Sequence, residues 1–142
     1  MIVQARNVPR KCGEPIGWFN RPSVEYTGRG NELCCFAWNG RYFRSSEADV
    51  RRACDKIVQL CNGNEHEDGE PVGVSDVEYE WGLIPDDAAR RYGWPGNEEY
   101  SYPCFVYERC GPGTYLYDIF KEDVLLISIP EPANPMEYYM EV

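Results

Sequence analysis

The sequence predicts an α+β fold in which one main helix packs on an antiparallel sheet of four to five strands, preceded by an N-terminal hairpin or extension. A single long amphipathic helical pattern occupies residues 46–63, and the segments after it are mostly aromatic or β-branched, as strands are. The helical segment precedes the strand segments instead of alternating with them. This order favours α+β over an alternating α/β design.

The length and composition predict one folded domain. The chain has 142 residues, of which 43% are hydrophobic and 14% aromatic. We expect an irregular N-terminal extension over residues 1–30 and a single domain over residues 31–142. No apolar run approaches the ~20 residues that cross a bilayer, and no signal-peptide pattern follows Met1, so we expect a mature chain that does not enter a membrane.

The first elements are read from turn residues. Prolines and glycines without apolar periodicity predict an extended arm over residues 1–30. After it, two short apolar runs flank Asn39 and Gly40, a pair that suits a two-residue type I′ turn because both of its positions need positive φ. We therefore predict a hairpin at this point.

The segment 46–63 predicts the main helix. Ser46 with Asp49 offers an N-cap, and Gly63 stands where a helix end needs left-handed backbone. Four residues at helical spacing form the expected core face: Val50, Cys54, Ile57 and Cys61. Two helical turns, ~10.5 Å, separate the two cysteines on this face, so each pairs elsewhere or remains a buried thiol.

Four later segments predict strands, because each is aromatic or β-branched and bounded by Gly, Pro or acidic residues. They are residues 76–84, 100–110, 114–120 and 124–129. The stretch 85–99 between the first two is expected to be a long loop or to carry a short helical turn.

The cysteine content favours a secreted chain with disulfides. Seven cysteines stand at positions 12, 34, 35, 54, 61, 104 and 110, and the odd number leaves at least one outside any intrachain pair. With one histidine and no Cys-x-x-Cys pair, the spacing is unlike that of a zinc site. We expect no metal and no other cofactor.

The net charge of −10 is unevenly distributed. Residues 1–56 carry a net charge of +4 and residues 57–142 one of −14. An acidic surface opposes nonspecific phosphate binding, but a local basic face in the first half is able to accept RNA. The candidate basic patch consists of Arg41, Arg44, Arg51 and Arg52. A solvated surface without a ligand is the simpler interpretation of these charges.

The loop His66–Gly73 (HEDGEPVG) joins the predicted helix to the predicted strands. It is followed by Tyr79-Glu80-Trp81, by Tyr100-Ser101-Tyr102-Pro103 and by Pro112-Gly113. Over residues 33–132 this order resembles the fungal guanyl-specific ribonucleases of the T1 and N1 type, and the loop is the most specific part of the resemblance. The resemblance implies a microbial ribonuclease T1-like fold.

The resemblance does not carry over the catalytic residues of that family. Such ribonucleases need a general base, a general acid and a cation at one phosphate. In the family the histidine of this loop lies outside the active site, so His66 is not a catalytic candidate. Counted from the loop, the family's first catalytic histidine falls near Tyr79 and its glutamate on Glu80 or Ser101. Its arginine falls on Leu116 or Tyr117, and its second histidine on Glu131 or Pro132. We therefore predict an inactive pseudo-ribonuclease with no catalytic residue.

A small cysteine-bearing chain of this kind looks like the ribonuclease-like effectors of plant-pathogenic fungi, notably powdery mildews. The resemblance implies a secreted monomer with a virulence or avirulence role, delivered into host tissue or cells, that binds a host plant protein, an immune receptor or RNA. The candidate binding surface is an aromatic sheet face: Tyr79, Glu80, Trp81, Tyr100, Tyr102, Tyr115 and Tyr117. For each aromatic residue, packing in the core is the simpler alternative.

Two other functions stay open from the sequence. One is an active extracellular guanyl-type endoribonuclease with a rearranged site. The other is a disulfide-rich adhesion or inhibitor domain whose loop resembles the ribonucleases by accident.

Overall fold

The computed structural model describes residues 22–96, 103–130 and 133–135. The chain forms two compact units, each built from two segments. We call the first, Met1–Glu47 with Phe105–Ser128, the sheet unit, and the second, Ala48–Cys104 with Ile129–Val142, the helical unit. The structure is mixed α/β, with a five-stranded sheet and one main helix, which agrees with the predicted α+β class.

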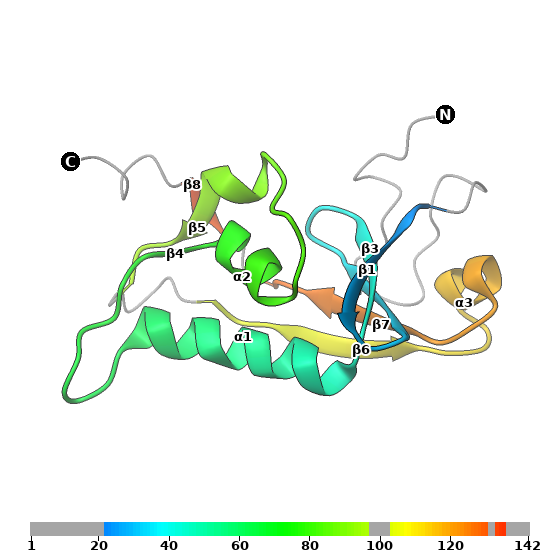
Figure 1. Ribbon diagram of the computed structural model, residues 1–142, viewed down its shortest axis with the longest axis horizontal. Helices are drawn as coiled ribbons and strands as arrows, with labels where there is room; N and C mark the ends of the chain where they lie inside the picture. Colours follow the sequence, from blue (N-terminus) through cyan, green and yellow to red (C-terminus); the bar gives the residue numbers. More distant parts are fainter. Residues whose placement is uncertain (1–21, 97–102, 131–132, 136–142) are drawn as a thin grey trace. The chain divides into compact units, whose positions relative to one another are not determined.

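The sheet unit contains five strands and one short helix (Figure 1). The elements are β1 (Val24–Arg29), β2 (Glu32–Phe36), β3 (Arg41–Ser45), β6 (Val106–Cys110), α3 (Tyr115–Phe120) and β7 (Val124–Ser128). The strands are arranged in the order β1-β3-β2-β7-β6.

The sheet is mixed, so the expected antiparallel sheet is wrong. The pairs β2–β3 and β6–β7 are antiparallel, whereas β1–β3 and β2–β7 are parallel. The parallel pairs arise because β1 and β2 lie on opposite sides of β3, and because β7 returns beside β2 after a long excursion of the chain. Such long-range pairing leaves no local mark in the sequence.

The first 30 residues were expected to be irregular. Residues 1–21 lie outside the described residues, but Val24–Arg29 forms β1, so for this part the expectation is wrong. The boundary drawn at residue 30 falls inside the sheet unit. Gly30 and Asn31 alone connect β1 to β2.

The predicted β2–β3 hairpin is confirmed, but its turn differs. The pairing runs from Glu32 with Ser45 to Phe36 with Arg41, which leaves a four-residue loop. Gly40 has φ 76°, but Asn39 does not have a positive φ. In the described part of the chain, Lys121 is the one non-glycine residue that does. Asn39 therefore does not adopt the left-handed backbone that a type I′ turn requires.

The helical unit contains the main helix α1 (Glu47–Asn62) and several shorter elements. These are β4 (Val72–Gly73), α2 (Val74–Glu80), the 3₁₀ turn η2 (Ala89–Arg91), β5 (Tyr92–Trp94) and β8 (Asn134–Pro135). The three short strands form a small sheet of their own in the order β4-β5-β8, and both of its strand pairs are antiparallel.

The main helix is confirmed. The buried side chains of α1 are Val50, Ala53, Cys54, Ile57 and Cys61, which include all four residues of the predicted face. Gly63 has φ 70°, and its N–H donates to the carbonyl oxygen of Gln59 at 2.9 Å. Gly63 thus ends α1 in left-handed backbone, as the sequence predicts.

Two predicted strands are helices instead. In α2 the buried residues Val74, Val77 and Glu78 recur at helical spacing, and the Gly73 N–H donates to the Asp76 carboxylate at 2.8 Å. That bond satisfies a backbone donor at the start of the helix. Aromatic content indicated strands at residues 76–84, but spacing and capping favour the helix.

The segment 114–120 likewise forms α3. Thr114 caps this helix, because its Oγ1 accepts from the Tyr117 N–H at 3.4 Å, and Leu116 and Phe120 are buried one turn apart. By contrast, the predicted strand at residues 124–129 is confirmed as β7. The strand at 100–110 is confirmed for Val106–Cys110, the turn at 85–99 is η2, and residues 97–102 lie outside the described part.

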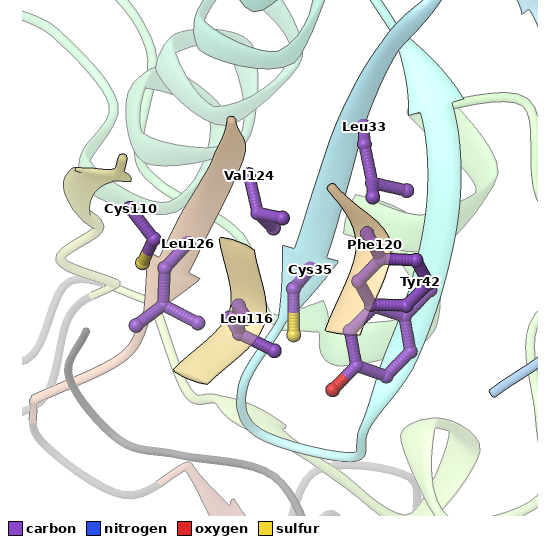
Figure 2. Packing of buried hydrophobic residues seen from close by; sticks show 8 residues of the cluster. All are labelled: Leu33, Cys35, Tyr42, Cys110, Leu116, Phe120, Val124 and Leu126. Atoms are coloured by element: carbon purple, nitrogen blue, oxygen red, sulfur yellow. The ribbon is translucent and has the colours of Figure 1, made fainter. Parts of the chain in front are cut away.

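One face of the sheet unit packs against α3 (Figure 2). Leu33 and Cys35 of β2 and Val124 and Leu126 of β7 share this face, while the residues between them, such as Cys34 and Leu125, are buried on the opposite face. The completed cluster consists of Leu33, Cys35, Tyr42, Cys110, Leu116, Phe120, Val124 and Leu126. The rings of Tyr42 and Phe120 lie 5.2 Å apart at 42°. Strand alternation thus places one apolar layer under a short amphipathic helix.

Candidate recognition surfaces

The candidate aromatic surface does not form on one sheet face. Tyr79 and Glu80 lie on α2 with Trp81 directly after it, whereas Tyr115 and Tyr117 lie on α3 of the other unit. None of these five residues belongs to a strand. The two further candidates, Tyr100 and Tyr102, lie outside the described residues.

The three neighbours around the end of α2 have different surroundings. Trp81 is 1% exposed, and its Nε1–H donates to the Val50 carbonyl oxygen at 3.3 Å, so it belongs to the core and not to a surface. Tyr79 is 70% exposed. The Glu80 carboxylate accepts from the Lys56 ammonium group at 3.0 Å. Tyr79 alone of the three offers an open aromatic ring.

On α3, Tyr115 is exposed and Tyr117 is partly buried. Leu116 between them is fully buried in the cluster with Phe120. The helix therefore directs one side chain inward and leaves its neighbours at the rim. The ribonuclease resemblance assigns the catalytic arginine to Leu116 or Tyr117. Leu116 is a core residue, and Tyr117 is a partly buried tyrosine.

The candidate basic patch is divided between the two units and its described charges are compensated. Arg41 binds Glu25 through two hydrogen bonds, Nε to Oε2 at 2.8 Å and Nη2 to Oε1 at 2.6 Å. Arg44 binds both oxygens of Glu122 in the same way, at 2.5 and 2.9 Å. These bonds to Glu122 raise the pKa of the Arg44 guanidinium above its usual value.

The remaining two arginines lie on α1 of the helical unit. Arg52 forms an ion pair with Asp49 one turn earlier, and Arg51 is exposed beside it. Bidentate pairing occupies the donors with which a guanidinium grips a phosphate, and charge compensation weakens the field that attracts one. Arg41, Arg44 and Arg52 therefore each have a carboxylate partner that weakens their attraction for phosphate.

The loop around His66 is organised by Asn64. The Asn64 Oδ1 accepts from the backbone N–H groups of His66 and Glu67, at 2.7 and 2.9 Å. The His66 side chain is 84% exposed, and its nearest charged neighbour is Glu65. A Cβ on Gly69 would stand 1.9 Å from the Cys61 carbonyl oxygen, so the loop lies closely against the end of α1. His66 thus belongs to a closely packed loop, and its own side chain points to solvent.

A shallow pocket of about 220 Å³ lies between the last turns of α1 and this loop. Leu60 and Lys56 line it from the helix, and Asn64, Glu67 and Asp68 from the loop. Within the described ranges, no group of three or more His, Cys, Asp or Glu residues is placed to hold a metal ion.

The cysteines are mostly in the thiol form. Five of the described cysteines are thiols, namely Cys34, Cys35, Cys54, Cys61 and Cys104, while Cys110 is disulfide-bonded. Both thiols of the expected helix face are buried. Burial raises the pKa of Cys34 and of Cys35 to about 12, so these thiols are poor nucleophiles.

Sequence reasoning missed two polar arrangements of the sheet unit and one of the helical unit. Arg109 of β6 bonds to Glu32 and to Glu47, and bonding to Glu47 raises its guanidinium pKa. The Glu25–Arg41 pair was missed because β1 was not anticipated. In the helical unit, the buried Glu78 accepts from the Asp86 N–H at 3.2 Å. The helical spacing of residues 74, 77, 78 and 81 was the signal available for it.

In the part of the chain that the structure describes, no helix combines the length and apolar character needed to cross a membrane. Comparison of the chain with protein families, with curated proteins and with solved structures finds no match.

Proposed function

We propose that the chain is a secreted, non-catalytic effector of the ribonuclease-like class, which acts by binding a host plant protein or immune receptor. The observation that carries this proposal is the state of Tyr79-Glu80-Trp81. Trp81 is a core residue, Glu80 is bonded to Lys56, and the triplet lies at the end of a helix instead of along a strand. This placement supports a role other than general acid–base catalysis at these residues.

The ribonuclease-like part of the proposal rests on a limited segment. It is supported by α1 and the loop His66–Gly73 that follows it, whereas α2 after the loop departs from the strand that the resemblance implies. The mixed five-stranded sheet does not support the ribonuclease-like part of the proposal. The ribonuclease-like part of the proposal therefore rests on one helix and one loop, and a cleavage assay tests it.

A protein partner is favoured over RNA. Arg41, Arg44 and Arg52 each hold a carboxylate, and the chain has a net charge of −10. Both features oppose phosphate binding. In the helical unit, Tyr79 and Ile84 are 70% and 80% exposed, and large exposed side chains of this type are frequent anchors in protein interfaces.

The first experiment is a cleavage assay. The purified chain is incubated with guanosine-containing single-stranded RNA across pH 4–9, with a guanyl-specific ribonuclease as positive control. We expect no cleavage above the buffer blank. Cleavage that disappears in Glu80→Gln and persists in Glu65→Gln, whose loop side chain is 87% exposed, would overturn the proposal in favour of an active ribonuclease with a rearranged site.

The second experiment measures RNA binding by fluorescence anisotropy over a range of salt concentrations. We expect weak binding at ~0.15 M salt. Tight binding that falls steeply with salt, and that is lost in the double variant Arg51→Gln with Arg52→Gln, would assign RNA as the partner instead. The single variant Arg52→Gln, which releases Asp49, serves as the control for altered helix charge.

A further inference from the structure

Strand β1 is the least buried strand of the sheet unit. None of its six residues is fully buried, and Tyr26 is 77% exposed. Val24 alone is placed against the core cluster, as a partly buried neighbour. The next strand, β3, has Tyr42, Phe43 and Ser45 buried. Removal of β1 therefore uncovers little apolar surface, so the hydrophobic effect holds this strand weakly.

The pairing of β1 is also interrupted. Val24, Glu25 and Tyr26 pair with consecutive residues of β3, but the register then shifts, and Arg29 pairs with Ser45. Thr27 and Gly28 are left between these pairs, with Gly28 at φ 76°. The other three strand pairs of the sheet keep a continuous register. An interrupted edge pair opens at lower cost than a continuous one.

Polar contacts beyond the strand ladder hold β1 in place, among them two side-chain contacts and the bond from the Ser46 N–H to the Arg29 carbonyl oxygen. Glu25 forms the two-bond ion pair with Arg41, whose side chain is 13% exposed, and the Thr27 hydroxyl donates to the Arg44 carbonyl oxygen at 2.6 Å. A charge-assisted pair with two hydrogen bonds is the stronger and the more specific of these contacts. Recognition of β1 by β3 thus depends on a carboxylate at one position of an extended segment.

We propose that β1 is a displaceable strand, and that the partner protein supplies an extended segment that takes its place beside β3, parallel to it, with a carboxylate on Arg41. Detachment of β1 at Gly30 also breaks the bond from the Ser46 N–H to the Arg29 carbonyl oxygen. This inference deepens the proposed recognition function, because it names the surface and the chemistry of the partner segment. Addition of a strand to a sheet edge is a recurrent way of binding a peptide, since main-chain bonds give affinity and side chains give specificity.

The occupant is defined by what β1 itself presents. A carboxylate must stand at the position of Glu25, and a residue that tolerates solvent at that of Tyr26. Because β1 competes with the incoming segment, the apparent affinity is reduced by the fraction of molecules in which β1 is detached. Weakening of β1 in the protein should therefore strengthen binding of the partner segment.

The test uses a fluorescein-labelled peptide with the sequence of residues 22–30, PSVEYTGRG, and the full chain. Binding is measured by anisotropy to the wild type and to Glu25→Gln. We expect the variant to bind the peptide about threefold to tenfold more tightly, because loss of one ion pair raises the detached fraction by that factor. A peptide with Gln in place of its Glu should bind the variant more weakly by a similar factor.

The matched controls are a scrambled peptide and the protein variant Glu122→Gln, which removes the ion pair of Arg44 and leaves Glu25 in place. Peptide affinity that is equal in wild type and Glu25→Gln, or that is indifferent to the Glu of the peptide, contradicts the proposal. Native-state hydrogen exchange gives a second readout, in which the β1 amides should exchange before those of β2 and β7. Exchange of β1 only through global unfolding would overturn it. Neither readout involves nuclease activity or RNA, so failure here is distinct from failure of the proposed function.

Discussion

The two-residue connection between β1 and β2 passes over the backbone that leads from β3 into α1. Gly30 has φ 147°, and a Cβ at this residue would lie 2.5 Å from the Ser46 nitrogen and 2.7 Å from the Ser45 carbonyl carbon. The Ser46 N–H donates to the Arg29 carbonyl oxygen at 3.1 Å, which holds the two segments together. Neither obstacle is a flexible side chain, so the backbone itself has to move to admit a methyl group.

Gly30→Ala should lower the free energy of unfolding by about 2 to 4 kcal/mol, since steric overlap adds to the strain of a positive φ. The control is Gly28→Ala. Gly28 also has positive φ, at 76°, but a Cβ there meets nothing within 4 Å. Gly28→Ala should lower the free energy of unfolding by only about 1 kcal/mol. Urea denaturation of both variants gives the comparison, and equal losses would show that crowding at the crossing contributes nothing.

The buried thiols of β2 make stability depend on pH in the alkaline range. In the unfolded chain a cysteine ionises near pH 9.0, whereas Cys34 and Cys35 in the folded chain stay protonated to about pH 12. Between these values the unfolded chain releases protons that the folded chain retains. The free energy of unfolding therefore decreases as pH rises, by up to about 1.4 kcal/mol per pH unit for each thiol. Burial also raises the pKa of Tyr42, which acts in the same direction above pH 10.0.

The variant Cys35→Ala should reduce this slope by about the contribution of one thiol. Denaturation at a series of pH values from 8.5 to 11 measures it. Leu33→Ala is the control, because it removes a side chain from the same cluster without removing a titrating group. It should lower stability at every pH and leave the slope as it is. An unchanged slope in Cys35→Ala would mean that this thiol does not contribute.

At the scale of single elements, the sequence predicted α1 and β7 well and α2 and α3 poorly. The helix α1 spans Glu47–Asn62, so its apolar periodicity extends over many turns and outweighs local noise. Each of α2 and α3 has only two buried apolar residues in all, and the tyrosines of these helices favour strands by composition. For helices this short, the first-turn hydrogen bonds of Asp76 and Thr114 are better indicators than aromatic content.

The cap of α3 can be tested directly. Thr114 Oγ1 accepts from the Tyr117 N–H and donates to the Gly111 carbonyl oxygen at 2.8 Å. Thr114→Ala should lower the free energy of unfolding by about 1 kcal/mol, because the Tyr117 N–H loses the hydroxyl that caps it, whereas the Gly111 carbonyl oxygen keeps the Thr114 N–H. Thr114→Ser keeps the hydroxyl and should lose much less. Thermal denaturation of the two variants distinguishes a capping role from a contribution of the threonine methyl group.

At the scale of the whole molecule, the cysteine inventory makes a chemical prediction. The sequence has seven cysteines, five of the described ones are thiols, and Cys110 is disulfide-bonded. Alkylation of the denatured, unreduced chain followed by peptide mapping should therefore label these five cysteines as thiols and leave Cys110 unlabelled. Fewer thiols would contradict this pattern and would indicate the more extensive disulfide framework that composition favoured.

The candidate site was less predictable than the fold class. The alternation of apolar residues identifies a core face, but it does not show which carboxylate meets which arginine. Arg41 and Arg44 looked like an open basic patch because their partners, Glu25 and Glu122, come from segments far away in sequence. Trp81 looked like a surface aromatic because a strand was assumed where a helix forms. In both cases the deciding contact depends on a topology that no local pattern encodes.

The crossing at Gly30 also has a consequence for the order in which a growing chain acquires its structure. β1 leaves the ribosome first, yet its described partner β3 emerges only after β2, and the crossing is complete only once Ser46 is present. β2 also lacks its parallel neighbour at that stage, because Leu33 pairs with Val124 of β7, which is synthesised after α1 and β6. Synthesis therefore delivers β2 long before its parallel partner β7. A ribosome-bound chain that stops short of residue 124 carries a hairpin with one side of β2 open, which is a state that chaperones recognise.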